Sequence, residues 1–170
     1  MAKTKEQKKA ILERLEDAVK TSASTVFVHF NGLPVGEETN MRGGLRDEGV
    51  SYFVARKTLV ARALESAGVE GEQPILEGEI AVAYLPAQAD GSDDPTAPAR
   101  NVYSFVKKYG DKLSIVGGVF EGRFMDAAEM NEVATIPPVN TLRGMFANVV
   151  NSPIQGLVVA LNGIAEKKEA

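Results

Sequence analysis

The stretch 139–165, VNTLRGMFANVVNSPIQGLVVALNGIA, constrains the fold more than any other segment of the chain. Its apolar residues recur with the i, i+3, i+4, i+7 spacing of an amphipathic helix. Arg143 is its only charged residue, and amides fill most other polar positions. Pro153 and Gly156 interrupt the pattern, which predicts a kink or two helical segments in series. The apolar positions are Leu142, Phe146, Val149, Val150, Ile154, Leu157, Val158, Leu161 and Ile164.

Such a helix must bury its apolar stripe, and three partners are possible. The first is the protein's own core, the usual partner of an apolar helix. The second is a membrane surface, but helices that bind membranes usually carry many Lys and Arg. We also expect no apolar run to reach the length of a membrane span. The third is another protein that packs its own helices along this one. The stiff Ile136-Pro137-Pro138 break weighs against the core, yet the residues alone leave the first and third partners close.

Composition narrows the class of protein. A chain of 170 residues with 44% hydrophobic and 25% charged residues fits one soluble domain plus an appendage. There is no Cys, so disulfides and thiol chemistry are excluded, and a single His, His29, argues against a His-based metal site. No signal-peptide pattern opens the chain. We therefore expect a cytoplasmic protein with no cofactor and no metal.

The charge is unevenly placed along the chain. Residues 1–62 hold 11 Lys and Arg against 8 Asp and Glu, whereas residues 63–135 hold 5 against 13. Lys5, Lys8 and Lys9 lie near the start of the first predicted helix, where the helix dipole would favour acids. This asymmetry is a weak indication that the N-terminal third meets a polyanion. Solvated surface lysines explain the residues equally well.

Before residue 139 the sequence predicts alternating helices and strands. Thr4 and Gln7 have the capping-box spacing of a first helix, with a buried stripe running from Ile11 to Val19. The run 24–30, STVFVHF, is apolar on both faces apart from His29 and predicts a central strand. The later predictions are helix 34–48, strand 50–55, a helix ending at 67, strand 79–85, an unstructured or mobile loop 86–98, helix 99–109, strand 112–120, a turn at 121–122 into strand 123–125, and a short helix 126–134.

These elements predict an α/β fold: a small mixed β-sheet flanked by helices, followed by a protruding C-terminal amphipathic helix. The sheet is expected to be mixed because helices alternate with strands while one strand pair is joined by a hairpin. In the helix 34–48, Met41 and Leu45 face inward, and Gly43-Gly44 costs about 1 kcal/mol per glycine relative to Ala. A glycine pair of this kind is tolerated where another backbone or a ligand approaches closely. His29 is expected to be a packed or capping histidine, and no catalytic constellation emerges.

Four blocks in order resemble the bacterial large-subunit ribosomal protein of the L-ten family, the stalk base protein. They read QKKAILERL, VFVHFNGL, VARKTLVARALE and VFEGRFMDAAEMNEVATIPP, and the resemblance runs from Lys5 to Ala170. It implies a non-enzymatic structural component of the large ribosomal subunit. It also implies an rRNA-anchoring α/β domain over 1–135, a Pro break at 136–138, and a helix over 139–170 that binds dimers of the acidic stalk protein, called L seven/twelve.

The resemblance also implies partners and site residues. The partners would be rRNA of the GTPase-associated centre, the stalk dimers, neighbouring ribosomal proteins and, indirectly, translational GTPases, but no membrane. In that family each apolar run of the tail seats one dimer, so the runs 142–151 and 154–165 imply two dimers. The nine apolar positions of the tail would bind them. The rRNA-binding residues would be Lys5, Lys8, Lys9, Arg42, Arg46, Arg56, Lys57 and Arg62. Family members often carry Asn at the position of Lys57.

Overall fold

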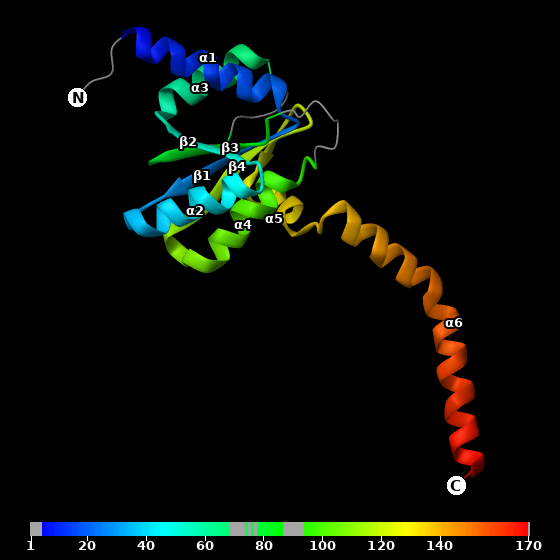
Figure 1. Cartoon of the computed structure of the whole chain (residues 1–170). Helices are drawn as coiled ribbons and strands as arrows, with labels where there is room; N and C mark the ends of the chain where they lie inside the picture. Colours follow the sequence, from blue (N-terminus) through cyan, green and yellow to red (C-terminus); the bar gives the residue numbers. More distant parts are fainter. Residues whose placement is uncertain (1–4, 69–73, 75, 77, 87–93, 170) are drawn as a thin grey trace. The chain divides into compact units, whose positions relative to one another are not determined.

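The computed structural model describes residues 5–68, 74, 76, 78–86 and 94–169. They form two compact units, Met1–Ile136 and Pro137–Ala170. The elements of the first unit, drawn in Figure 1, are α1 (Lys5–Thr21), β1 (Ser24–Phe30), α2 (Val35–Asp47), β2 (Ser51–Ala55), α3 (Lys57–Ala67), β3 (Ile80–Tyr84), α4 (Ala97–Tyr109), the 3₁₀ turn η1 (Gly110–Lys112), β4 (Leu113–Phe120), β5 (Arg123–Asp126) and α5 (Ala127–Thr135).

Five strands of the described residues form one sheet in the order β2-β3-β1-β4-β5. Every described pairing is antiparallel, so the α/β fold class is confirmed but the expected mixed sheet is wrong. The reason lies in the crossovers. The helical connection through α2 does make β1 and β2 parallel, but β3 inserts between them and pairs with both. In the same way β1 separates the parallel strands β3 and β4.

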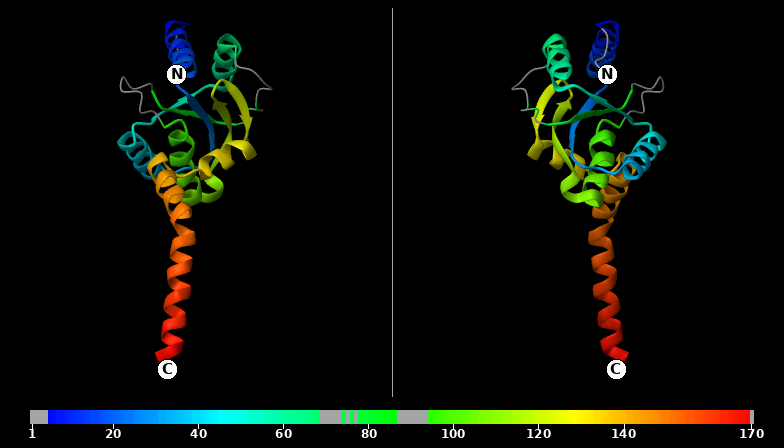
Figure 2. Two further views of the ribbon diagram at one scale, coloured as in Figure 1. Left: turned by 90° about the vertical axis from the view of Figure 1, so that its right-hand side faces the viewer. Right: turned by 90° about the vertical axis from the view of Figure 1, so that its left-hand side faces the viewer.

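Helices cover both faces of this sheet, as Figure 2 shows in two views. One buried cluster joins α2, α4 and α5 to the face that carries Val26 and Val28 of β1. The other joins α1 and α3 to the opposite face, through Phe27 of β1. Because β1 is apolar on both faces, it is buried between two helical layers. The prediction of a central strand at 24–30 is therefore confirmed.

Most predicted element positions are confirmed within one or two residues. Leu15, Ala18 and Val19 of α1 are buried, and so are Met41 and Leu45 of α2. Glu121 and Gly122 have φ angles of 49° and 81°, which close the predicted β4–β5 hairpin. Asp126 and Glu129 form a capping box at the start of α5, as the sequence predicts. The capping box expected at the start of α1 falls partly outside the described residues, because it includes Thr4.

Two predictions need correction. Strand β4 begins at Leu113, because residues 110–112 form the turn η1. The end of the predicted loop 86–98 is ordered, since α4 begins at Ala97 with buried Ala97 and Pro98. Asp94 organises this start: it accepts hydrogen bonds from the Thr96 backbone N–H (3.1 Å), the Thr96 hydroxyl (2.7 Å) and Arg100 Nη1 (2.9 Å). Burial raises the pKa of Asp94, but these hydrogen bonds together lower it below its usual value.

The two glycines in the middle of α2 have different environments. A Cβ on Gly44 would lie 2.9 Å from Cζ of Phe105, so the absence of a side chain there lets α4 pack closely. A Cβ on Gly43 would meet nothing within 4 Å. The close approach expected at this pair therefore exists at Gly44, and it comes from a side chain rather than from a backbone or a ligand. Gly43 has no packing role of this kind.

The second unit contains the helix α6 (Val139–Glu169). It begins directly after the Pro137-Pro138 break, and the Leu142 N–H donates to the Pro138 carbonyl at 3.0 Å. The helix is continuous through Pro153, so the alternative of two separate segments is wrong. Its axis bends midway in Figure 1, which agrees with the predicted kink, because proline cannot donate to the carbonyl four residues earlier.

Candidate nucleic-acid interface and apolar helix

The cations predicted to bind rRNA fall into separate groups on the first unit. Lys5 begins α1, and Lys8 and Lys9 are exposed one turn further along it. Lys9 Nζ lies 3.9 Å from Glu13 Oε1, a pair that is well exposed on both sides and therefore contributes little to stability. Arg62 is exposed on α3, which packs beside α1 on the same face of the sheet.

A second group surrounds the beginning of the edge strand β2. A cleft of about 190 Å³ is lined there by Arg14, Arg42, Arg46, Gly49, Val50, Ser51 and Tyr52, and we call it the β2 cleft. Arg42 and Arg46 come from α2 and were predicted. Arg14 comes from α1 and was not predicted, because its helical position looks like that of any solvated cation. The fold brings Arg14 beside Arg42 and Arg46, because α1 and α2 lie on either side of the edge strand β2.

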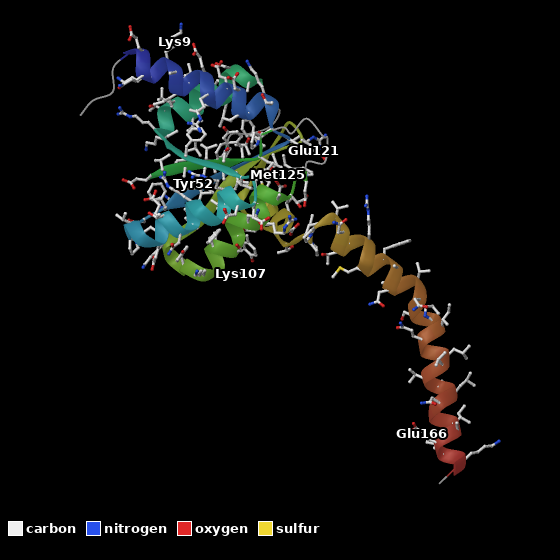
Figure 3. All side chains as sticks on the ribbon, in the orientation of Figure 1. Lys9, Tyr52, Lys107, Glu121, Met125 and Glu166 are labelled. Atoms are coloured by element: carbon white, nitrogen blue, oxygen red, sulfur yellow. The ribbon has the colours of Figure 1, made fainter. Side chains whose placement is uncertain are left out.

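Two arginines of the β2 cleft lie over aromatic rings of β2. Arg14 Cζ lies 4.8 Å from the centroid of the Phe53 ring, and Arg42 Cζ lies 5.4 Å from that of Tyr52. Neighbouring residues of a strand point to opposite faces, so the two cation–π contacts lie on the two faces of the sheet edge. Figure 3 labels Tyr52 at this edge. Arg42 also donates from Nε to Glu38 Oε1 at 3.1 Å.

The Tyr52 hydroxyl is a neutral member of this cleft. Burial, and after it the nearby Glu38 carboxylate, raise the pKa of Tyr52 to about 12, although Arg42 acts in the opposite direction. The phenol therefore keeps its proton throughout the physiological range. It can donate a hydrogen bond to an anion in the cleft without adding negative charge.

A third group lies at the opposite end of β2. A cleft of about 420 Å³ there is lined by Phe30, Val54, Ala55, Arg56, Lys57, Gly78, Glu79 and Ile80, and we call it the α3 cleft. Arg56 precedes α3 in an extended conformation and Lys57 is the first helical residue. Both side chains are exposed. Arg56 and Lys57, which the resemblance implies as rRNA-binding residues, therefore share one surface.

His29 packs near the α3 cleft rather than in a catalytic arrangement. Its Nδ1 lies 3.1 Å from the Glu79 carbonyl oxygen, and its ring lies against Gly78, where a Cβ would be 2.3 Å from Cε1. This agrees with the predicted packed histidine. Among the described residues, no cluster of three or more His, Cys, Asp or Glu could hold a metal ion.

The apolar stripe of α6 is exposed along the whole helix. The nine predicted apolar positions range from 40% exposed at Leu142 to 72% exposed at Phe146. Met145 and Val159 are also exposed, so the apolar surface is wider than the predicted stripe. The segment Val139–Lys168 is long and apolar enough to cross a membrane by length and composition alone. The expectation that no run reaches that length is therefore wrong.

The first unit is a helix-covered sheet with a basic edge, and the second is a helix with exposed apolar side chains. This organisation is typical of a structural protein that works within a larger assembly. Comparison with known proteins identifies the assembly. Residues 3–107 match the family model described as Ribosomal protein L10. The chain is 36% identical over 164 residues to the large ribosomal subunit protein uL10 of Staphylococcus carnosus (strain TM300), covering 96% of this chain and 95% of the relative. It is 35% identical, with the same coverage, to the uL10 protein of Staphylococcus aureus (strain JH9).

This chain belongs to the ribosomal protein L10 family. The resemblance found in the sequence is thereby confirmed, and so is the expected class: a structural protein of the large ribosomal subunit rather than an enzyme. The expected location, the ribosome in the cytoplasm, follows from the same membership.

Proposed function

We propose that this protein forms the base of the ribosomal stalk. The unit Met1–Ile136 anchors to large-subunit rRNA at the GTPase-associated centre, and α6 carries dimers of the acidic stalk protein, which recruit translational GTPases. The observation that carries this proposal is the exposed apolar surface of α6. A soluble helix of this length with such a surface requires a partner that buries it.

The chemistry of α6 favours helices of another protein as that partner. Within α6, Arg143 is the only charged residue before Glu166, so the helix lacks the cationic face that a membrane-surface helix would use. Asn and Gln flank the apolar side chains instead, and uncharged amides can be covered at lower cost than charges. Phe146, 72% exposed, and Leu161, 57% exposed, are the expected anchors of the two halves.

Three features support rRNA as the partner of the first unit. The net positive charge of residues 1–62 is opposite to that of residues 63–135. Lys8, Lys9 and the cations of the β2 cleft and the α3 cleft are exposed, and most of them have no carboxylate partner among the described residues. Phosphate contacts by such residues release counterions from RNA, which supplies affinity at physiological salt. Arg56 and Lys57 lie at the end of β2, within a block that resembles the family.

The two functions are expected to be separable. The described core clusters draw on no residue beyond Ala134, and the Pro137-Pro138 break precedes α6. The fragment 1–136 should therefore fold and bind RNA, while only the full chain should retain the stalk protein. The Pro137-Pro138 break thus separates the unit proposed to bind rRNA from the helix proposed to bind the stalk protein.

Co-purification of tagged protein from a bacterial lysate tests the proposal. We expect the intact chain to retain both a stalk-base rRNA fragment and the acidic stalk protein, and the fragment 1–136 to retain the rRNA alone. Recovery of neither partner by the intact chain would contradict the proposed function. Binding of an α6 peptide to anionic vesicles, without binding to the stalk protein, would instead support a membrane-surface role.

A further inference from the structure

The β2 cleft gathers three arginines that are distant in the sequence. Arg14 comes from the helical layer on one face of the sheet, whereas Arg42 and Arg46 come from the layer on the other face. They meet because β2 is an edge strand, so nothing in the described sheet separates the two layers there. The cleft volume of about 190 Å³ equals about six water molecules at ~30 Å³ each, which accommodates a phosphate group.

The charges of this cleft are incompletely compensated. Glu38 pairs with Arg42, but no carboxylate among the described residues pairs with Arg14 or Arg46. Like charges that converge in one cleft repel one another, and the repulsion is relieved when an anion binds between them. The cleft is therefore suited to an anion with several acceptor oxygens.

The local backbone also permits an anion. The C-terminal carbonyls of α2 would repel a phosphate if they were free. Here the Gly49 N–H donates to the Arg46 carbonyl at 2.9 Å, and the Val50 N–H donates to the Leu45 carbonyl at 2.8 Å. Gly49 has a φ of 76°, which makes this helix ending possible.

The aromatic rings of β2 prepare two of the arginines for binding. Arg14 lies over the Phe53 ring and Arg42 over the Tyr52 ring, and these cation–π contacts restrict both side chains. A cation–π contact leaves guanidinium N–H groups able to donate to an anion. A guanidinium held in this way can form two parallel hydrogen bonds to one phosphate with less loss of side-chain freedom.

We propose that the β2 cleft binds a backbone phosphate of RNA, with Arg14 as a phosphate ligand beside Arg42 and Arg46. This inference rests on the proposed rRNA anchoring and deepens it. A polyanion is favoured over a free phosphate ion because the α3 cleft lies at the other end of β2. The four residue steps from Ser51 to Ala55 span roughly 14 Å, at about 3.4 Å per residue. One RNA can occupy both clefts, whereas a free ion occupies one.

The variant Arg14→Gln tests the inference, with Arg123→Gln as its matched control. Arg123 is an exposed arginine on β5, the opposite edge of the same sheet, so both variants remove one positive charge from an edge. For the stalk-base rRNA fragment we expect Arg14→Gln to weaken binding about tenfold and to lower the slope of log K against log salt by about 1. Arg123→Gln should change neither. Arg14→Lys should restore the slope and only part of the affinity, because it keeps the charge and loses the planar fork.

Double variants locate the contact. Arg14→Gln and Arg42→Gln act on one phosphate, so their combined effect should be smaller than the product of the single effects. Arg14→Gln and Arg56→Ala act at opposite ends of β2, so their effects should multiply. Thermal unfolding of each variant shows that the folded state persists at the temperature of the binding measurement.

The outcomes separate this inference from the proposed function. If Arg14→Gln matches Arg123→Gln while replacement of Arg56 and Lys57 weakens RNA binding, the β2 cleft is not a phosphate site and rRNA anchoring stands. If the unaltered protein fails to bind the rRNA fragment, the proposed function itself is wrong. Titration with inorganic phosphate, followed by NMR of the arginine side chains, forms the second arm. Tight binding of phosphate that Arg14→Gln removes, with unchanged RNA affinity, would assign the cleft to a free anion and overturn the inference.

Discussion

Truncation of the chain after Asn151 should remove one of two stalk-protein dimers. Helix α6 has 31 residues, which gives a length of about 46 Å at ~1.5 Å per residue. Pro153 divides its apolar surface into the runs 142–151 and 154–165. The first run carries five exposed large apolar residues and the second carries six, so each offers a surface of similar size.

The copy number follows from this division. We expect four copies of the stalk protein on the intact chain and two after truncation, measured by native mass spectrometry of co-expressed complexes. Truncation after Ala165 removes only the charged EKKEA end and is the matched control, which should keep four copies. The melting temperature of the first unit should be unchanged, since the described core clusters include no residue of α6. Six copies on the intact chain, or four after removal of the second run, would refute the two-site reasoning.

Three further predictions concern RNA binding and stability. Replacing Arg56 and Lys57 together by Ala should weaken binding to the rRNA fragment and flatten its salt dependence; unchanged affinity and slope in a filter-binding titration would exclude them as contacts. Gly43→Ala should stabilise the protein by about 1 kcal/mol, or raise the melting temperature by about 3 °C, because α2 gains helix propensity. Gly44→Ala should gain less or lose stability, because the new Cβ meets the facing ring of α4, and equal effects at both glycines would contradict that packing. Asp94→Asn should cost about 1 kcal/mol at pH 7. Because the folded-state pKa of this carboxyl is lowered, its contribution is present above about pH 4 and is lost as the pH falls through the folded value, so denaturant melts of variant and parent should converge in acid.

Local patterns in the sequence predicted most elements of this fold. Apolar spacing placed Met41 and Leu45 inward on α2, and the D-x-x-E pattern at Asp126 predicted the start of α5. These features depend on residues within one or two turns of each other. The sheet order depends instead on which distant strands pair, and no local pattern indicates that β3 inserts between β1 and β2. That insertion is why an alternation typical of parallel strands yields an antiparallel sheet.

The residues of the candidate site also differ in whether the sequence alone can indicate them. The resemblance to the family singled out the arginines of α2 and the Arg56-Lys57 pair as rRNA-binding residues, an assignment that stays a prediction. Arg14 was not singled out, because its environment is created by Phe53, a residue of another element 39 positions later. A cation on a helix gives no sign in the sequence of whether an aromatic ring lies beneath it. The functional assignment of the tail depended on resemblance, since apolar spacing alone also fits a core helix.

The interleaved strand order has a consequence for how this chain acquires its structure. Strand β1 is made early, yet both its neighbours come much later: Val28 pairs with Ala81 on one side and with Ile115 on the other. During synthesis, β1 therefore lacks one of its two partner strands, β4, until about 90 more residues have emerged. Such long-range closure is slow relative to local helix formation, so this intermediate should be the point at which chaperones engage and aggregation begins. A fragment limited to residues 3–107, the span of the family match, lacks β4 and should not fold by itself.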